Sequence, residues 1–211
     1  MQIRRTRVSE PVIRSLLQIR FSSRASSRPS ESAWAIVAVL VFWAIGAYNG
    51  LIALRQIVRN GWAQIDVQLK RRHDLIPNLV ETVKGYATHE RETLEKVVQA
   101  RSNAVNASGP AAQGKAEGEL GQALSRLMLV VEQYPDLKAN QNFLALQEEL
   151  TSTENKVSFA RQAYNDSVMA YNTRIAVVPT NVIAGIFGFT PEEFFEITVA
   201  AEREVPKVSF N

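Results

Sequence analysis

The sequence has no cysteine and only two histidines among its 211 residues. The absence of cysteine excludes disulfides, thiolate zinc sites and cysteine nucleophiles, and it is compatible with either side of a membrane. His73 and His89 both lack a glutamate three residues earlier, which is the spacing that di-iron helical bundles use. The sequence therefore predicts neither a metal site nor a bound cofactor.

Other signatures of catalysis are also missing. There is no glycine-rich phosphate loop, no His-Glu-x-x-His motif and no Gly-x-Ser-x-Gly motif. An excess of positive charge is missing from most of the chain, because residues 32–211 carry 17 basic and 19 acidic side chains. Without a phosphate-neutralising surface, nucleic acid is not an expected partner. We expect a protein that is not an enzyme.

The first 31 residues differ from the rest, with seven arginines against two glutamates. This arm is also rich in serine, and we expect it to be disordered. Three interpretations stay open: a targeting segment, a basic tail on the cytoplasmic side, or a start codon assigned too far upstream.

Residues 32–54 contain no charged side chain. A helix of 23 residues is roughly 35 Å long, and a bilayer core is about 30 Å thick, so this stretch can cross a membrane. Trp34 and Trp43 suit a membrane interface. A cleaved signal peptide and a buried core helix are the alternatives. The lipid bilayer is therefore the first predicted partner, bound through residues 32–54.

Apolar residues keep helical spacing after this stretch, so we expect the transmembrane helix to continue into the first helix of a bundle. Asp74 and Pro77 suggest that this helix ends in a reversal or kink over residues 72–77. A second helix should run to about Asn106 and a third from about Gly114 to Gln133. A short helix over 181–188 and a further helix start at Thr190-Pro191-Glu192-Glu193 are also predicted.

The fourth predicted helix has the clearest pattern, with steps of three and four that are typical of a bundle seam. Its seam residues are Phe143, Leu146, Leu150, Thr153, Val157, Ala160, Tyr164, Ser167 and Tyr171. Several members are polar, which leaves an alternative function open. In that reading Tyr86, Thr153, Tyr164, Asn165 and Tyr171 surround a cavity that binds a small molecule or an ion.

Two segments are candidate interaction sites. The first is the densest polar run, and its competing interpretation is a solvated corner in which basic groups complement a helix dipole. The second is a cluster of phenylalanines, which would otherwise cap the bundle core. The candidate residues are Lys70, Arg71, Arg72, His73 and Asp74 in the first segment and Phe187, Phe189, Phe194 and Phe195 in the second.

Residues 61–87, GWAQIDVQLKRRHDLIPNLVETVKGYA, resemble the signature of the LemA family. The resemblance continues through residues 134–140, 146–150 and 163–172 and ends in Phe187-Gly188-Phe189. It implies an all-α protein of bacterial type, an antiparallel four-helix bundle with an N-terminal transmembrane helix continuous with its first helix. It implies no catalytic residue, because the family has no established activity.

The predicted organisation is therefore an arm over 1–31, a transmembrane helix over 32–54, a LemA-like bundle over 55–197 and a tail over 198–211. The resemblance implies a single-pass protein of the bacterial plasma membrane with the bundle in the cytoplasm. The seven arginines of the arm would favour the opposite orientation. We expect a non-catalytic scaffold or adaptor with an unidentified protein partner, and the sequence leaves homo-oligomerisation open.

Overall fold

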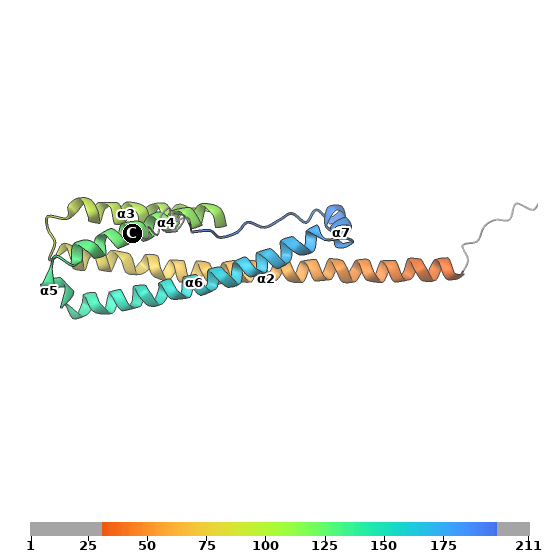
Figure 1. Cartoon of the computed structure of the whole chain (residues 1–211), viewed down its shortest axis with the longest axis horizontal. Helices are drawn as coiled ribbons and strands as arrows, with labels where there is room; N and C mark the ends of the chain where they lie inside the picture. The colour runs from red at the N-terminus through yellow and green to blue at the C-terminus, as the bar shows by residue number, and fades with distance from the viewer. Residues whose placement is uncertain (1–30, 198–211) are drawn as a thin grey trace, which may run out of the picture. The chain divides into compact units, whose positions relative to one another are not determined.

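The computed structural model describes residues 31–197, which form six helices and no strand (Figure 1). The predicted all-α class is confirmed, but the predicted bundle had four helices rather than six. The predicted tail over 198–211 and the basic arm, except Glu31, lie outside the described residues. The helices are α2 (Glu31–Lys84), α3 (Arg91–Asn106), α4 (Pro110–Val131), α5 (Pro135–Lys138), α6 (Gln141–Ala176) and α7 (Thr180–Phe187).

Helix α2 is continuous over 54 residues, so the predicted continuity of the apolar stretch with the first packed helix is confirmed. The predicted reversal over residues 72–77 is wrong, because α2 runs through Pro77 to Lys84. Proline cannot donate to the carbonyl four residues earlier, which here belongs to His73. The guanidinium Nε of Arg101 in α3 donates to that carbonyl oxygen at 2.7 Å. A side chain from a neighbouring helix therefore replaces the missing backbone hydrogen bond.

The remaining helix boundaries follow local signals. Helix α4 begins at Pro110 after Gly109, whose φ of 85° suits glycine. Helix α6 begins after Asn140, whose side chain accepts hydrogen bonds from the amides of Asn142 and Phe143. Helix α7 ends at Phe187 and is followed by Gly188 in the left-handed conformation. Residues 189–197 contain no helix, so the helix predicted to start at Thr190 is wrong.

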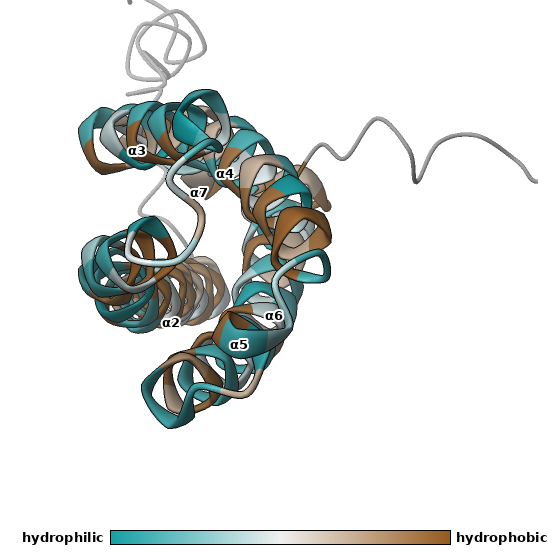
Figure 2. Cartoon of the chain, turned by 90° about the vertical axis from the view of Figure 1, so that its left-hand side faces the viewer, coloured by the Kyte–Doolittle hydropathy of each residue, from teal (hydrophilic) through white to brown (hydrophobic). Residues whose placement is uncertain are grey.

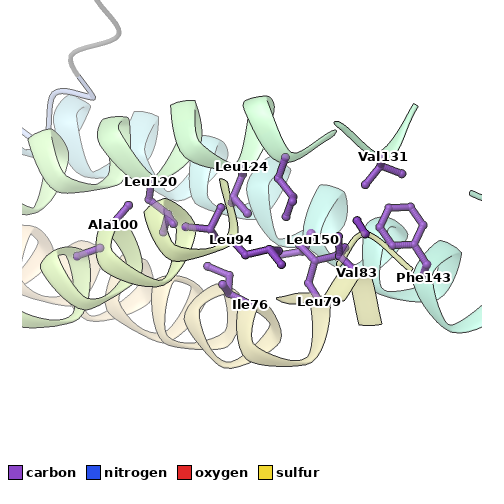
Figure 3. Packing of buried hydrophobic residues seen from close by; sticks show 14 of the residues in the cluster. Ile76, Leu79, Val83, Leu94, Ala100, Leu120, Leu124, Val131, Phe143 and Leu150 are labelled. Carbon is purple, nitrogen blue, oxygen red and sulfur yellow. The ribbon is translucent and has the colours of Figure 1, made fainter. Parts of the chain in front are cut away.

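The buried apolar residues form two clusters. The first joins the second half of α2 to α3, α4, α5 and the start of α6, and Figure 3 shows its packing. In that cluster Leu120, Leu124, Leu127 and Val131 of α4 are all buried. The second cluster joins residues 47–69 of α2 to the second half of α6, to α7 and to Phe195. Figure 2 shows hydrophilic and hydrophobic residues on different sides of the helices.

Residues 31–42, taken by themselves, are the first turns of α2, and their large apolar side chains are exposed. The exposed fraction is 63% for Trp34, 67% for Val39 and 76% for Phe42. By length and composition, α2 is long and apolar enough to cross a membrane, and the mean hydropathy of its apolar part is 2.1. Packing begins beyond these residues, where Ala47 and Leu51 are buried in the second cluster.

Candidate functional site

A buried carboxylate lies where α2, α3 and α4 meet. The side chain of Glu117 in α4 is fully buried, and its two oxygens face different partners. Oε1 lies 2.6 Å from Nε2 of His73 and accepts a hydrogen bond from the side-chain amide of Gln113 at 3.1 Å. Oε2 accepts a hydrogen bond from Arg72 at 3.3 Å. Gln113 also donates to the carbonyl of Ala104 in α3, so the cluster ties three helices together.

This cluster satisfies the charge and the hydrogen bonds of buried side chains. Glu117 balances the guanidinium charge of Arg72, and a buried charge without such a partner costs several kcal/mol. The side chains of Arg72 and His73 are only 6% and 8% exposed, so both are shielded from solvent. The pair of His73 and Glu117 does not belong to a larger group, because the described residues contain no set of three acidic or histidine side chains placed to hold a metal.

The structure divides the polar segment that sequence analysis proposed as an interaction site. Lys70, Arg71 and Asp74 are exposed, and Arg71 contacts Glu149 of α6 at 2.5 Å. Arg72 and His73 face the interior, where both bond the carboxylate of Glu117. There is no helix end at this segment, so the alternative interpretation, in which its basic groups complement a helix dipole, is wrong.

A second polar arrangement lies on α6 and binds the chain's own backbone. We call residues 188–197 the C-terminal segment, and Figure 1 shows it running from α7 toward α4. The side chain of Asn165 bonds both the amide and the carbonyl of Phe195, at 3.0 and 3.1 Å. Asn172, seven residues later on the same face, does the same for Glu192 at 2.9 Å for each bond. These paired bonds imitate those between neighbouring strands.

Two tyrosines precede the asparagines and complete this arrangement. The hydroxyl of Tyr164 donates to the carbonyl of Glu193 at 2.8 Å, and that of Tyr171 donates to Thr190 at 3.1 Å. Burial, followed by the negative charges of Glu192 and Glu193, raises the pKa of Tyr164 to about 12. Of the residues that were predicted to surround a ligand cavity, Tyr164, Asn165 and Tyr171 thus bind the C-terminal segment. Thr153 donates to the carbonyl of Leu150, and the hydroxyl of Tyr86 accepts a hydrogen bond from Asn140.

Close packing holds the same segment from two further helices. The ring of Trp62 in α2 lies 5.7 Å from that of Phe195 and 5.6 Å from that of Tyr164. The backbone of Glu196 also comes very near to Gly114 of α4. A Cβ atom on residue 114 would lie 2.2 Å from the carbonyl oxygen of Glu196. Only glycine allows this approach.

The four phenylalanines proposed as a core cap or a docking patch have separate environments. Phe195 is fully buried, which fits the core interpretation. Phe187 and Phe189 flank Tyr48 of α2, with ring centroids at 4.8 and 5.7 Å. Phe187 is nevertheless 59% exposed, and Phe194 is 40% exposed.

An apolar groove that was not predicted from the sequence lies between α2 and α6. Val67 of α2 and Phe159 of α6 line it and are 62% and 74% exposed, and Lys156 lies at its edge. Gln68 also lines the groove, and its side-chain carbonyl oxygen is buried and accepts no hydrogen bond from the described residues. The available signal in the sequence was Phe159 itself, a large apolar residue that lies outside the regular seam of α6.

Comparisons with known proteins place this architecture. The family model described as "LemA family" matches residues 61–210, which is more than half of the chain. The chain belongs to the LemA family. It is 26% identical to Protein LemA of Metamycoplasma hominis over 149 residues, which cover 70% of this chain and 68% of the relative.

Two further relatives carry a different name. The chain is 25% identical to Magnetosome protein MamQ 2 of Paramagnetospirillum magneticum and 24% identical to Magnetosome protein MamQ of Magnetospirillum gryphiswaldense. Each alignment covers 96% of this chain and 86% of the relative. The LemA match contains both the Glu117 cluster and the α6 face that binds the C-terminal segment. These arrangements therefore lie in the part of the chain that defines its family.

Proposed function

We propose that this LemA-family chain is a single-pass membrane protein whose packed helices act as a non-catalytic scaffold for another protein. The observation that carries the proposal is the exposed apolar start of α2, which continues without a break into a packed helical body. A row of exposed tryptophan, phenylalanine, valine and isoleucine side chains this large is costly in water. Inserted in lipid, the same side chains contribute favourably.

The interior of the packed body supports a non-catalytic role. The carboxylate of Glu117 forms hydrogen bonds with Arg72, His73 and Gln113. The hydroxyls of Tyr164 and Tyr171 donate hydrogen bonds to the C-terminal segment. These groups fix the positions of helices. A rigid body attached to a membrane is suited to present a surface to a partner.

The groove at Phe159 is the surface that we assign to that partner. It lies beside residues 63–68 of α2, at least nine residues beyond the end of the uncharged stretch at Leu54. Nine helical residues correspond to about 14 Å, so membrane lipid does not reach the groove. Exposed Phe159 and Val67 suit a protein that inserts an apolar side chain.

Site-specific photo-crosslinking in native membranes tests this assignment. A photoreactive residue replaces Phe159 in one full-length chain and Glu154 in the control, because Glu154 is exposed on the same helix but about 140° away around it. We expect one discrete product from position 159 and none from position 154. Equal labelling from both positions, or no product from either, would contradict a specific docking surface.

The mass of the crosslinked product shows whether the partner is a different protein or a second copy of this chain. A product at the summed mass of this chain and a different protein supports the scaffold proposed here. A product at twice the mass of the chain would mean that the partner is a second copy of the chain and that the groove is a homo-oligomer interface.

We further propose that the packed body lies on the cytoplasmic side of the bacterial plasma membrane. The natural absence of cysteine permits a direct test, because Thr151→Cys on the exposed face of α6 would be the only thiol. A maleimide that cannot cross the membrane should label this thiol only after the cells are broken. Labelling in intact cells would place the body outside.

A further inference from the structure

Helix α7 is apolar on its exposed side as well as on its packed side. Ile183 and Ala184 are buried, whereas Val182, Ile186 and Phe187 are 59%, 71% and 59% exposed. Val178, in the turn that precedes the helix, is 79% exposed. A helix that is hydrophobic all round is normally enclosed by protein or by lipid.

The sequence around α7 extends this apolar character. Residues 175–191, from the last turn of α6 through α7 to the C-terminal segment, contain no charged side chain. Arg174 precedes this stretch in the last turn of α6, and Glu192 follows it. Glu192 lies 3.5 Å from Arg55, the first charged residue after the uncharged stretch of α2. The two uncharged stretches therefore end at the same pair of charges.

The packing of α7 places it beside the uncharged stretch of α2. Ile183 and Ala184 share a core cluster with Ala47 and Leu51, and Tyr48 contacts Phe187 and Phe189. Tyr48 lies six residues before Leu54, which corresponds to about 9 Å along the helix. This distance matches the depth of about 5–10 Å to which interfacial helices bury their apolar side.

We propose that α7 and the turn that precedes it insert into the same bilayer that α2 crosses, just below the headgroups on the side of the packed body. They would thus form a second lipid contact. This inference rests on the proposed membrane anchor. The bound species is the acyl-chain region of the lipid just below the headgroups. Arg174, exposed at the end of α6, then lies where anionic headgroups can pair with it.

Depth-dependent fluorescence quenching tests the second contact in the full-length chain. Single cysteines replace Ile186, Val178, Val39 or Thr151, each chain is labelled with the environment-sensitive dye NBD, and each is reconstituted into phosphatidylcholine and phosphatidylglycerol vesicles. Val39 reports on the anchor, and Thr151 is an exposed position on α6 in the packed body. Vesicles carry lipids with a nitroxide quencher at either a shallow or a deep acyl position.

We expect the dyes at Ile186 and Val178 to show blue-shifted emission and to be quenched more strongly by the shallow nitroxide than by the deep one. The dye at Val39 should respond most to the deep nitroxide, and the dye at Thr151 should respond to neither. The use of two positions on either side of the α7 N-terminus guards against the failure of one variant to fold.

The outcomes separate the inference from the anchor. Quenching at Val39 with water-like emission at Ile186 and Val178 would overturn the second contact and leave the anchor in place. Blue-shifted emission at Ile186 without quenching would show that a protein surface covers α7, which also overturns the inference. Water-like emission at all four positions would overturn the anchor itself.

Discussion

Arg101 should be necessary for stability only as long as residue 77 is proline. In the wild-type chain Arg101 supplies the 2.7 Å hydrogen bond that the His73 carbonyl cannot receive from Pro77. Hydrogen bonds from charged donors are worth about 1.5–3 kcal/mol. We therefore expect Arg101→Met to lower the free energy of unfolding by about 2 kcal/mol.

In a Pro77→Ala background the amide of residue 77 can bond the same carbonyl, so removing Arg101 should cost less than about 1 kcal/mol there. Urea unfolding of the four full-length chains in a mild detergent, followed by circular dichroism, gives the double-mutant cycle. A coupling energy of about 1–2 kcal/mol is expected. Additive effects of the two substitutions would refute the proposal that Arg101 replaces the lost backbone bond.

Three further substitutions test the other contacts. Gly114→Ala should destabilise the chain by about 1–3 kcal/mol, because the new Cβ displaces the C-terminal segment, whereas Gly121→Ala, which meets nothing within 4 Å, should be neutral or stabilising by up to about 1 kcal/mol. Urea unfolding should show this difference, and equal effects would contradict the close approach. Glu117→Leu should cost about 3–5 kcal/mol in the same assay and Glu117→Leu with Arg72→Met much less, since the single change leaves a buried guanidinium unpaired. Tyr164→Phe should cost about 1 kcal/mol near neutral pH. It should also flatten the pH dependence above pH 10, because the Tyr164 phenol, with a pKa of about 12 in the folded chain and about 10 when unfolded, makes wild-type stability fall as pH rises between these values.

Local periodicity predicted the helices but not the contacts between distant segments. The stripe of α2 was predicted because Leu51, Val58, Ile65 and Leu69 keep helical spacing, and all four are buried. The helix end at Pro77 was predicted from a sound local rule. It was wrong because the compensating donor, Arg101, is far away in sequence and belongs to another helix.

The candidate sites show the same limit. Glu117 lies three residues before Leu120 on the buried face of α4, but nothing in the local pattern identifies Arg72 of another helix as its partner. The helix start at Thr190-Pro191-Glu192-Glu193 satisfies local rules, yet residues 189–197 form no helix. Instead, the amide side chain of Asn172 binds Glu192 and that of Asn165 binds Phe195. Two correctly spaced Tyr-Asn pairs were visible in the sequence, but their partner was not.

The claim that residues 32–54 anchor the chain in a membrane is tested most directly by washing membranes from cells that express the full-length protein with alkaline carbonate. This treatment releases peripheral proteins and leaves those that span the bilayer. We predict that the chain stays in the membrane pellet. Its quantitative release into the supernatant would contradict the anchor, and with it the membrane scaffold and the lipid contact of α7.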